Sequence, residues 1–431
     1  MKREKPFYGW YIVFSCTLII GASIGLFFNA IVVFVVPVPE SLGLSRGGFT
    51  FYTTVQSVVV TLITPFYGYF FNKLGQRNVM IIAAVVCCGV QFGFSFSGHL
   101  WQFYALSVIH GIFIVGIEIM SVGTLINNWF VEKKGIAMGV AYTGSGIVAG
   151  IMIPILTKVI ENYGWQMGYR TIGFCALFLL LPAIIFIVRD KPQDIGLLPL
   201  GIEAEDLDEL EGGGESVLNE GVTRAEALKS SIFWLFSLGT FLTAVITMGI
   251  SIHSAAFLTD IGYTAGYASI VVSIFMFVTV AAKLLFGMIF DKFGLGAGAF
   301  LTGFVCVLSS ILLLFSAAGG LPFIFAVIFG FAYATQTISI TLLTSHLFGS
   351  KDFANIYGLI MMVMMIGAAI GSPMPAFIFD AVGSYMPAWI LFVFLSIITT
   401  ASFMMAAALS RKYKNRRCAQ RIFASSKEKE R

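Results

Sequence analysis

Charged residues are scarce in this chain of 431 residues. Asp, Glu, Lys and Arg together make up 11% of it, whereas 58% is hydrophobic and the mean hydropathy is +0.92. A soluble globular domain carries about 25% charged residues, so this deficit excludes an ordinary soluble enzyme. Because a helix needs about 20 apolar residues to cross a bilayer, a chain of this length has room for roughly a dozen crossings.

Sequence patterns for metal, nucleotide or covalent chemistry are also missing. The six cysteines form no CxxC pair and no cluster with histidine, so we expect neither a disulfide framework nor a metal site. The phosphate-binding pattern GxxxxGK[ST] and the metal pattern HExxH do not occur. We therefore expect no bound cofactor, no ATP-driven step on this chain, no enzyme activity and no nucleic-acid partner.

Apolar segments long enough to cross a membrane follow one another along most of the chain. The first six cover residues 11–36, 50–71, 78–97, 101–129, 136–157 and 169–188, and the second six cover 231–257, 265–289, 298–317, 321–346, 355–379 and 385–409. Lipid offers no hydrogen-bond partners to the backbone, so each crossing is expected to be a helix. The pattern predicts an all-α membrane protein with twelve transmembrane helices in two six-helix halves.

Basic residues are distributed unevenly over the segments between these helices. Of the 26 Lys and Arg residues, Arg46, Lys158 and Arg170 fall on the side away from the N-terminus, and Lys283 falls deep within a span. The other 22 lie on the side of the N-terminus. Since basic loops stay in the cytoplasm, both termini are predicted to be cytoplasmic, and we expect a multi-pass protein of a bacterial inner membrane.

Acidic residues gather between the sixth and seventh helices. Residues 189–230 hold 11 of the 22 Asp and Glu residues and contain no segment that could cross a membrane. The chain is therefore predicted to consist of a first half (1–188), an acidic cytoplasmic linker (189–230), a second half (231–410) and a basic cytoplasmic tail (411–431).

A constant offset of 219 residues relates special positions of the two halves. The pairs are Gly68 and Gly287, Asn72 and Asp291, Lys73 and Lys292, Gly75 and Gly294, Gly111 and Gly330, Gly139 and Gly358, and Pro154 and Pro373. Six crossings separate the two copies, and this even number gives both halves the same topology. Transporters with such repeats bind their substrate between the halves.

One repeated block resembles a known loop. Gly68-Tyr-Phe-Phe-Asn72-Lys73-Leu-Gly75-Gln-Arg77 is similar to the loop between helices 2 and 3 of the major facilitator superfamily, and Gly287-Met-Ile-Phe-Asp291-Lys292-Phe-Gly294 is similar to its second copy between helices 8 and 9. The first glycine permits close helix packing, the carboxylate can cap a neighbouring helix, and the basic residues remain at the interface. Asn72 replaces the usual Asp, so the cap in the first copy carries no charge.

Further motifs resemble the branch of this superfamily that contains the monocarboxylate transporters and the oxalate/formate antiporter. They are Tyr8-Gly9-Trp10, Trp129-Phe130-x-x-Lys133-Lys134-Gly135-x-Ala137-x-Gly139, Tyr163-Gly164-Trp165, and Arg189-Asp190-Lys191-Pro192-x-Asp194-x-Gly196-Leu197. The resemblance covers essentially the whole chain, and it implies the major facilitator fold and secondary transport.

Lys283 is the candidate anchor for a substrate. A charge within a span costs about 2.5 to 3.5 kcal/mol on insertion scales, and it usually faces a cavity or pore. The resemblance implies that role, because this branch carries an Arg there that is taken to hold the substrate carboxylate. The alternative is a lysine whose stem extends to the interface. The resemblance places Met364 at the second cationic position of the oxalate carrier, and one cation favours a monocarboxylate.

Glu118 and His110 are the candidates for proton coupling. Glu118 is the only carboxylate deep within a predicted span, and a buried carboxyl can hold or release a proton near neutral pH. His110 lies eight residues earlier, near the same helical face. Glu118 could also neutralise Lys283 across a cavity. For both residues the alternative is a structural role within the helix bundle.

Four polar side chains within the spans could donate or accept hydrogen bonds from a substrate. They are Gln336, Tyr333, Tyr142 and Asn29. At helical spacing they could equally join neighbouring helices, each contributing about 0.6 kcal/mol.

Together these features favour a secondary active transporter of a small organic anion, above all a monocarboxylate, coupled to a proton or a counter-anion. The alternative is a carrier of a neutral or zwitterionic nutrient or drug, in which Glu118 would bind an amine and Lys283 a carboxylate. A receptor or membrane enzyme on the same scaffold is a third reading. We expect the protein to act as a monomer in the lipid bilayer.

Overall fold

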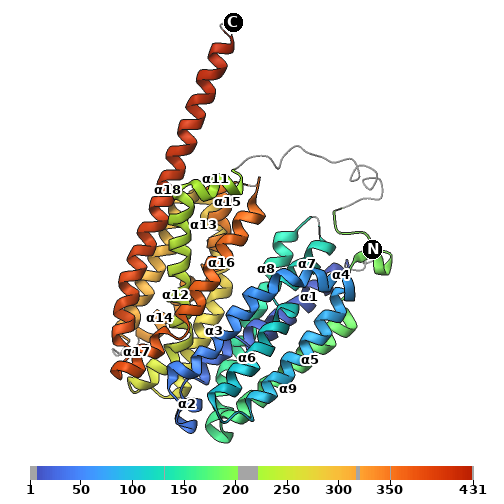
Figure 1. The fold of residues 1–431 in the computed structure, drawn as a ribbon, viewed down its shortest axis with the longest axis vertical. Helices are drawn as coiled ribbons and strands as arrows, with labels where there is room; N and C mark the ends of the chain where they lie inside the picture. The colour runs from blue at the N-terminus through green and yellow to red at the C-terminus, as the bar shows by residue number, and fades with distance from the viewer. Residues whose placement is uncertain (1–6, 131, 202–221, 317–320, 350, 430–431) are drawn as a thin grey trace, which may run out of the picture.

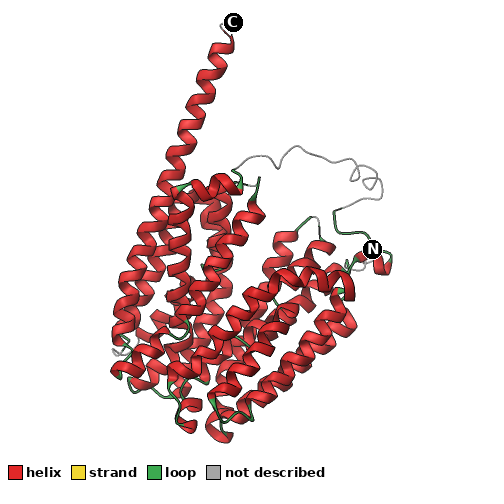
Figure 2. Cartoon of the chain, viewed as in Figure 1, coloured by secondary structure: helices red, strands yellow, loops and turns green. Residues whose placement is uncertain are grey.

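The chain folds into helices that form two bundles lying side by side. The computed structural model describes residues 7–130, 132–201, 222–316, 321–349 and 351–429, and these are helical almost throughout (Figure 2). Helices of the first half form one bundle and helices of the second half form the other (Figure 1). The predicted all-α class with two halves is confirmed.

The first bundle contains short breaks within several spans. Its elements are α1 (Gly9–Ile20), η1 (Gly21–Leu26), η2 (Asn29–Val33), α2 (Pro37–Leu42), α3 (Arg46–Ile63), η3 (Thr64–Phe66), α4 (Tyr67–Leu74), α5 (Gln76–Phe94), α6 (Leu100–Ile114), η4 (Val115–Ile117), α7 (Ile119–Trp129), α8 (Lys134–Tyr163), α9 (Trp165–Pro182) and η5 (Ala183–Ile187). The short turn η6 (Pro192–Ile195) follows.

The second bundle contains the longest helices of the described residues. Its elements are α11 (Arg224–Lys229), α12 (Ser231–Asp260), α13 (Ala265–Leu314), α14 (Leu321–Ala334), α15 (Ile338–Phe348), α16 (Phe353–Gly371), α17 (Met374–Val382) and α18 (Met386–Lys429). α13 comprises two spans that meet at Gly294, whose backbone is not helical. α18 continues well beyond residue 410, where the second half was predicted to end (Figure 1).

Each of the twelve predicted segments contains helix. Among the described residues ten helices are long and apolar enough to cross a membrane, and the bent pair α14 and α15 makes an eleventh. The remaining segment, 50–71, contains α3, η3 and α4. α3, the longest of these, falls short of the same apolarity because it begins with Arg46 and carries Gln56 and several Thr residues.

The offset of 219 residues reappears in the backbone. Gly75 and Gly294 both adopt a positive φ, 79° and 73°, which favours glycine. Close helix packing is repeated as well. A Cβ on Gly111 would lie 2.9 Å from the carbonyl oxygen of residue 56, and one on Gly330 would lie 2.8 Å from that of residue 275. The two halves are therefore structural repeats that pack in the same way.

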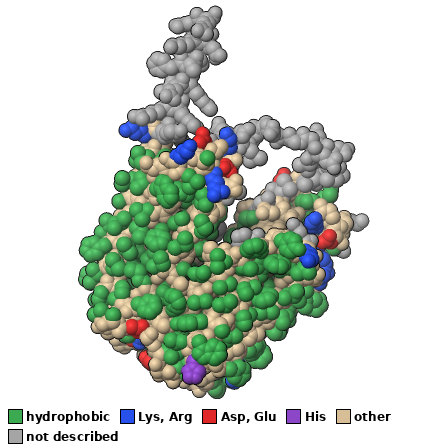
Figure 3. Space-filling view, in the orientation of Figure 1, with side chains coloured by type: hydrophobic (Ala, Val, Ile, Leu, Met, Phe, Trp, Pro, Cys, Tyr) green, Lys and Arg blue, Asp and Glu red, His purple; other side chains and the backbone are tan. Residues whose placement is uncertain are grey.

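The two ends of the molecule differ in charge. The start of α1, the helix α11 and the end of α18 lie at one end, which we call the linker end (Figure 1). α3 begins at the opposite end, which we call the Arg46 end. On the face seen in Figure 3 the middle is apolar, as a lipid-facing surface must be, and Lys and Arg gather at the linker end. Residues 202–221 of the predicted linker lie outside the described part.

The described end of the predicted linker is attached to the second half. The backbone N–H of Arg224 donates a 2.6 Å hydrogen bond to Oδ2 of Asp352, and the side chain of Asn355 donates a 2.6 Å bond to Oδ1. The bond from Asn355 and then that from Arg224 hold the pKa of Asp352 below its usual range. α11 is thereby fixed beside the start of α16.

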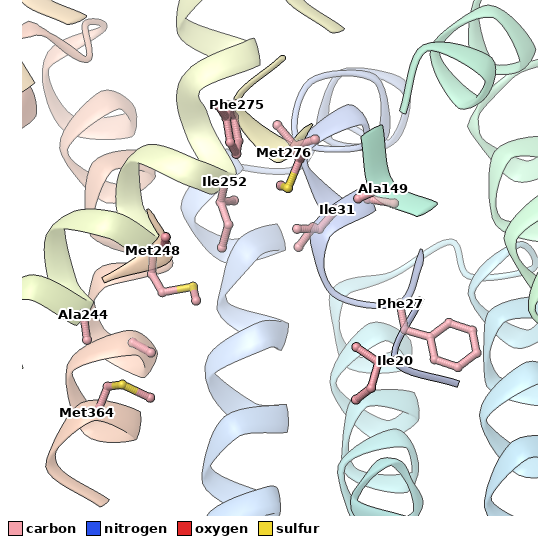
Figure 4. Close-up of a cluster of buried hydrophobic side chains, with 14 of the residues drawn as sticks. Ile20, Phe27, Ile31, Ala149, Ala244, Met248, Ile252, Phe275, Met276 and Met364 are labelled. Atoms are coloured by element: carbon pink, nitrogen blue, oxygen red, sulfur yellow. The ribbon is translucent and has the colours of Figure 1, made fainter. Parts of the chain in front are cut away.

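The halves meet over part of their facing surfaces. α3 contacts α16 and α17, η2 contacts α12, and α8 contacts α13. Ile31 and Ala149 of the first half lie beside Ile252 and Met276 of the second, and all four are buried (Figure 4). At the linker end the surface between the halves is hollowed (Figure 3). The halves are thus closed toward the Arg46 end and open toward the linker end.

Candidate substrate and coupling sites

Lys283 lies on the face of α13 that packs against α8 of the other half. A Cβ on Gly146 of α8 would lie 2.7 Å from the backbone oxygen of Met276 and 2.7 Å from the side chain of Val280. Lys283 follows Val280 by three residues and Met276 by seven, and residues at these spacings share one helical face. The sequence could not assign this orientation, because the span is apolar all round.

The contact at Gly146 also sets the level of Lys283 along α8. α8 and α13 run in opposite directions, so the contact at Gly146 places Lys283 level with Tyr142. Three residues before Tyr142, a Cβ on Gly139 of α8 would meet no atom within 4 Å. Lys283 is half-buried, and it forms no hydrogen bond or ion pair with the described residues. An unpaired cation in apolar surroundings favours an anionic ligand.

The four predicted hydrogen-bonding residues fall into three different situations. Tyr333 Oη of α14 donates a 3.0 Å hydrogen bond to Asn29 Oδ1 of η2, so these two join the halves. Gln336 donates to the hydroxyl of Thr247 within the second half. Tyr142 is half-buried, and its hydroxyl group makes no hydrogen bond with the described residues. Only Tyr142 is brought to the level of Lys283 by the contact at Gly146.

The fourth span is interrupted at Glu118. The backbone of Glu118 is extended, with φ −100° and ψ −162°, between η4 and α7. The hydroxyl of Tyr67 donates a 2.7 Å bond to the carbonyl of Ile112, and the hydroxyl of Ser121 donates a 3.1 Å bond to the carbonyl of Val115. These side chains satisfy backbone groups near the break, which lipid could not do.

The carboxyl group of Glu118 has no charged partner in the second half among the described residues. Glu118 and Lys283 do not form an ion pair here. Glu118 itself makes no hydrogen bond or ion pair with the described residues through its side chain.

His110 borders a small polar cavity inside the first half. The residue is 1% exposed, and neither ring nitrogen has a hydrogen-bond partner among the described residues. The cavity has a volume of about 10 Å³, and Gln56, Gln91, Tyr52 and Tyr169 contribute polar groups to its wall. A polar cavity of this size has room for one water molecule, which would satisfy several of these groups at once.

The loop motif of the first half receives its charged cap from another segment. The backbone N–H of Arg77, at the start of α5, donates a 2.8 Å hydrogen bond to Oδ1 of Asp190. Asp190 follows the sixth span, and a carboxylate is stabilising at a helix N-terminus. The side chains of Asn72 and Asp291 lie outside the described part of the structure. Asp190 therefore supplies the negative charge that Asn72 lacks.

The glycine and lysine positions of the two loop motifs have similar surroundings in the two halves. Gly68 lies in α4 and Gly287 in α13. The exposed ammonium groups of Lys73 and Lys292 lie 5.7 and 5.5 Å from the ring centroids of neighbouring aromatic residues, Tyr69 and Phe293.

Three of the four branch motifs meet at the linker end of the first half. The ring of Tyr8 lies 5.4 Å from that of Trp129, and the ring of Trp10 lies 5.3 Å from that of Phe130. The indole N–H of Trp129 donates a 2.9 Å hydrogen bond to the carbonyl of Arg189. These motifs thus tie the starts and ends of three spans together, a structural role that their sequence did not reveal.

Sequence reasoning missed a charged contact between the halves. Arg46 of α3 binds Asp260 of α12 and, through its backbone, Asp380 of α17. The available signals were weak: Arg46 is one of three basic residues on its side, and Asp380 is related to Glu161 by the offset of 219.

Comparison with known proteins supports the fold from an independent direction. The family model described as Major Facilitator Superfamily matches residues 14–372. The chain belongs to this superfamily. The predicted family is therefore confirmed, and this major facilitator chain is a multi-pass membrane transporter.

Similarity to individual members of the superfamily is low. The MFS-type transporter pytF of Aspergillus terreus is 25% identical over 256 residues, which cover 58% of this chain and 78% of that protein. Monocarboxylate transporter 3 of Gallus gallus is 21% identical over 412 residues, which cover 88% and 74%. The match to monocarboxylate transporter 2 of Mus musculus spans only 34% of that protein.

Among solved structures, a bacterial homolog to the human lysosomal transporter Spinster, in an inward-facing and unoccupied conformation, has a TM-score of 0.74. It is 14% identical, and the match covers 95% of this chain and 98% of that chain. At this identity the likeness shows the fold alone.

Proposed function

We propose that this transporter moves a small organic anion, specifically a monocarboxylate, by alternating access. Lys283 carries the proposal. It lies on the contact face between the halves and has no partner among the described residues. A carboxylate bound there would neutralise a desolvated ammonium group, which is costly to leave unpaired. Tyr142, at the same level, is available for a further hydrogen bond to the substrate.

The position that the resemblance matches to a second cation favours one carboxylate over two. Met364 of α16 is 4% exposed and lies with Ala244 and Met248 of α12 in the apolar cluster (Figure 4). The sequence contains no Lys or Arg between Asp352 and Ser410. A dicarboxylate would therefore leave one negative charge without a cation.

For proton-coupled transport, we assign proton uptake and release to Glu118 and His110. Anion exchange is the alternative mode, and it needs no net proton movement. Glu118 lies at the break of a discontinuous helix, a feature that places ion sites in other transporters. His110 has both ring nitrogens free of described partners in a cavity that fits a water molecule. Asn29, Tyr333 and Gln336 would contribute hydrogen bonds once their present contacts rearrange. The basic linker end is assigned to the cytoplasm.

Uptake into proteoliposomes tests this function. Proteoliposomes that contain the purified chain are loaded with one monocarboxylate. Its exchange against a panel of monocarboxylates, dicarboxylates and zwitterionic amino acids is then measured with and without an inward proton gradient. We expect exchange of monocarboxylates. Exchange of zwitterions alone would instead support the neutral or zwitterionic carrier.

A further inference from the structure

Arg46 connects the two halves through its side chain. It is the first residue of α3, and its Nη1 and Nη2 donate hydrogen bonds of 2.5 and 3.0 Å to the two carboxylate oxygens of Asp260, the last residue of α12. Glu40 lies 3.5 Å from Nη2, and the guanidinium group lies 4.3 Å from the ring centroid of Phe379. Arg46 is only 8% exposed. A two-pronged pairing of this kind is strong, and a buried charge without it is costly.

Asp380 connects the halves through the backbone of the same residue. Oδ1 of Asp380 accepts a 3.1 Å bond from the N–H of Arg46, and Oδ2 accepts a 2.7 Å bond from the N–H of Gly47. The first N–H groups of a helix have no partner within the helix, and they favour a negative charge. Asp380 belongs to α17, so the second half caps a helix of the first.

Further contacts continue from Arg46 along α3. The hydroxyl groups of Thr53 and Ser372 are hydrogen-bonded to each other, and Thr54 donates a 2.6 Å bond to the carbonyl of Ala369. Ser372 is 4% exposed. The start of α3 is therefore joined to α16 and α17 by a continuous row of polar contacts.

The internal symmetry provides a comparison within the same molecule. The offset of 219 relates Arg46 to Ala265 and Asp380 to Glu161. Ala265 and Glu161 line a cavity of about 280 Å³ between the halves, and Glu161 forms no hydrogen bond or ion pair through its side chain with the described residues. The charged contact is thus present at one of two symmetry-related places.

We propose that Arg46, Asp260 and Asp380 form a latch that closes the Arg46 end of the transport pathway. Asp260 and Asp380 both belong to the second half, so opening this end must break the ion pair and the helix cap together. The intact latch then holds the protein closed at the Arg46 end and open at the linker end. This proposal concerns the conformational cycle, and it holds whichever substrate is carried.

Labelling of a buried cysteine tests the latch without any substrate. The reporter is Ser372→Cys, and its reaction with a water-soluble maleimide is compared with that of the protein lacking the reporter. Arg46→Gln, Asp260→Asn and Asp380→Asn should each raise the labelling rate by about tenfold or more, because each removes a charged partner from the interface. Glu161→Gln is the matched control, and its rate should stay within about twofold of that of the reporter protein.

A double variant tests whether Arg46 and Asp260 act as one unit. The double variant Arg46→Gln, Asp260→Asn should label no faster than either single variant, because the pair is lost in each. If the latch variants label at the rate of the reporter protein, or if Glu161→Gln matches them, the latch proposal is wrong.

Hydrogen exchange gives a second measurement that does not depend on Arg46 variants folding well. Asp380→Asn leaves no buried charge unpaired, and it keeps the Arg46–Asp260 pair. It should still accelerate amide exchange in the peptide that contains Gly47, whereas Glu161→Gln should not. Unchanged exchange at Gly47 in Asp380→Asn would overturn the role of Asp380.

Discussion

Replacement of Gly146 by alanine should shift the protein away from the conformation described above. The added Cβ would lie 2.7 Å from the backbone oxygen of Met276 and 2.7 Å from Val280 Cγ2, whereas real Cβ atoms essentially never approach closer than 3.0 Å. Because a backbone oxygen cannot move alone, α8 and α13 must separate. Overpacking of this kind costs about 1 to 3 kcal/mol, which corresponds to about 5- to 150-fold in a conformational equilibrium.

The labelling rate of Ser372→Cys measures this shift. It should rise in Gly146→Ala by a factor within that range, because the cost falls only on the conformation in which α8 and α13 touch. Gly139→Ala is the control on the same helix, since its Cβ would meet no atom within 4 Å. Equal labelling rates in Gly146→Ala and Gly139→Ala would refute the reasoning.

Three further predictions concern coupling, selectivity and stability. Glu118→Gln should preserve exchange and lose accumulation driven by a proton gradient, because the amide cannot carry a proton; accumulation against a gradient by this variant would make Glu118 structural. Oxalate and malonate should inhibit monocarboxylate exchange weakly, since Lys283 is the one Lys or Arg deep within a predicted span. A dicarboxylate that bound more tightly than its mono-acid counterpart would show that a second positive centre was missed. Asp190→Ala should lower the free energy of unfolding by about 1 kcal/mol through loss of the cap on α5, seen as a lower melting temperature. Asp194→Ala should change it less, because Asp194 bonds only its own exposed turn at Lys191.

The sequence was sufficient to predict the helical spans and the internal repeat, but it was insufficient to predict where a span is interrupted. Span positions follow from apolar length, and the internal repeat follows from glycines whose close packing the structure reproduces at Gly111 and Gly330. The interruption at Glu118 could not be predicted, because it depends on hydroxyl groups of Tyr67 and Ser121 that reach the backbone only after the helices pack.

The candidate site could likewise be predicted only in part from the sequence. Lys283 stood out because a cation in an apolar span is rare, yet its orientation required the contact at Gly146. The latch was missed because Asp260 and Asp380 are 214 and 334 residues away from Arg46 along the chain. Contacts of this range arise from the docking of whole halves, which local patterns do not encode.

Monocarboxylate exchange by Lys283→Ala in proteoliposomes tests the central claim most directly. Lys283→Ala should insert and fold like the parent and lose exchange by more than about tenfold, because removal of one partner of a desolvated charge pair costs about 2 to 5 kcal/mol. Lys283→Arg should retain part of the activity, and Lys292→Ala, an exposed cation of the same helix, should retain nearly all of it. Exchange by Lys283→Ala at the parent rate would contradict the account.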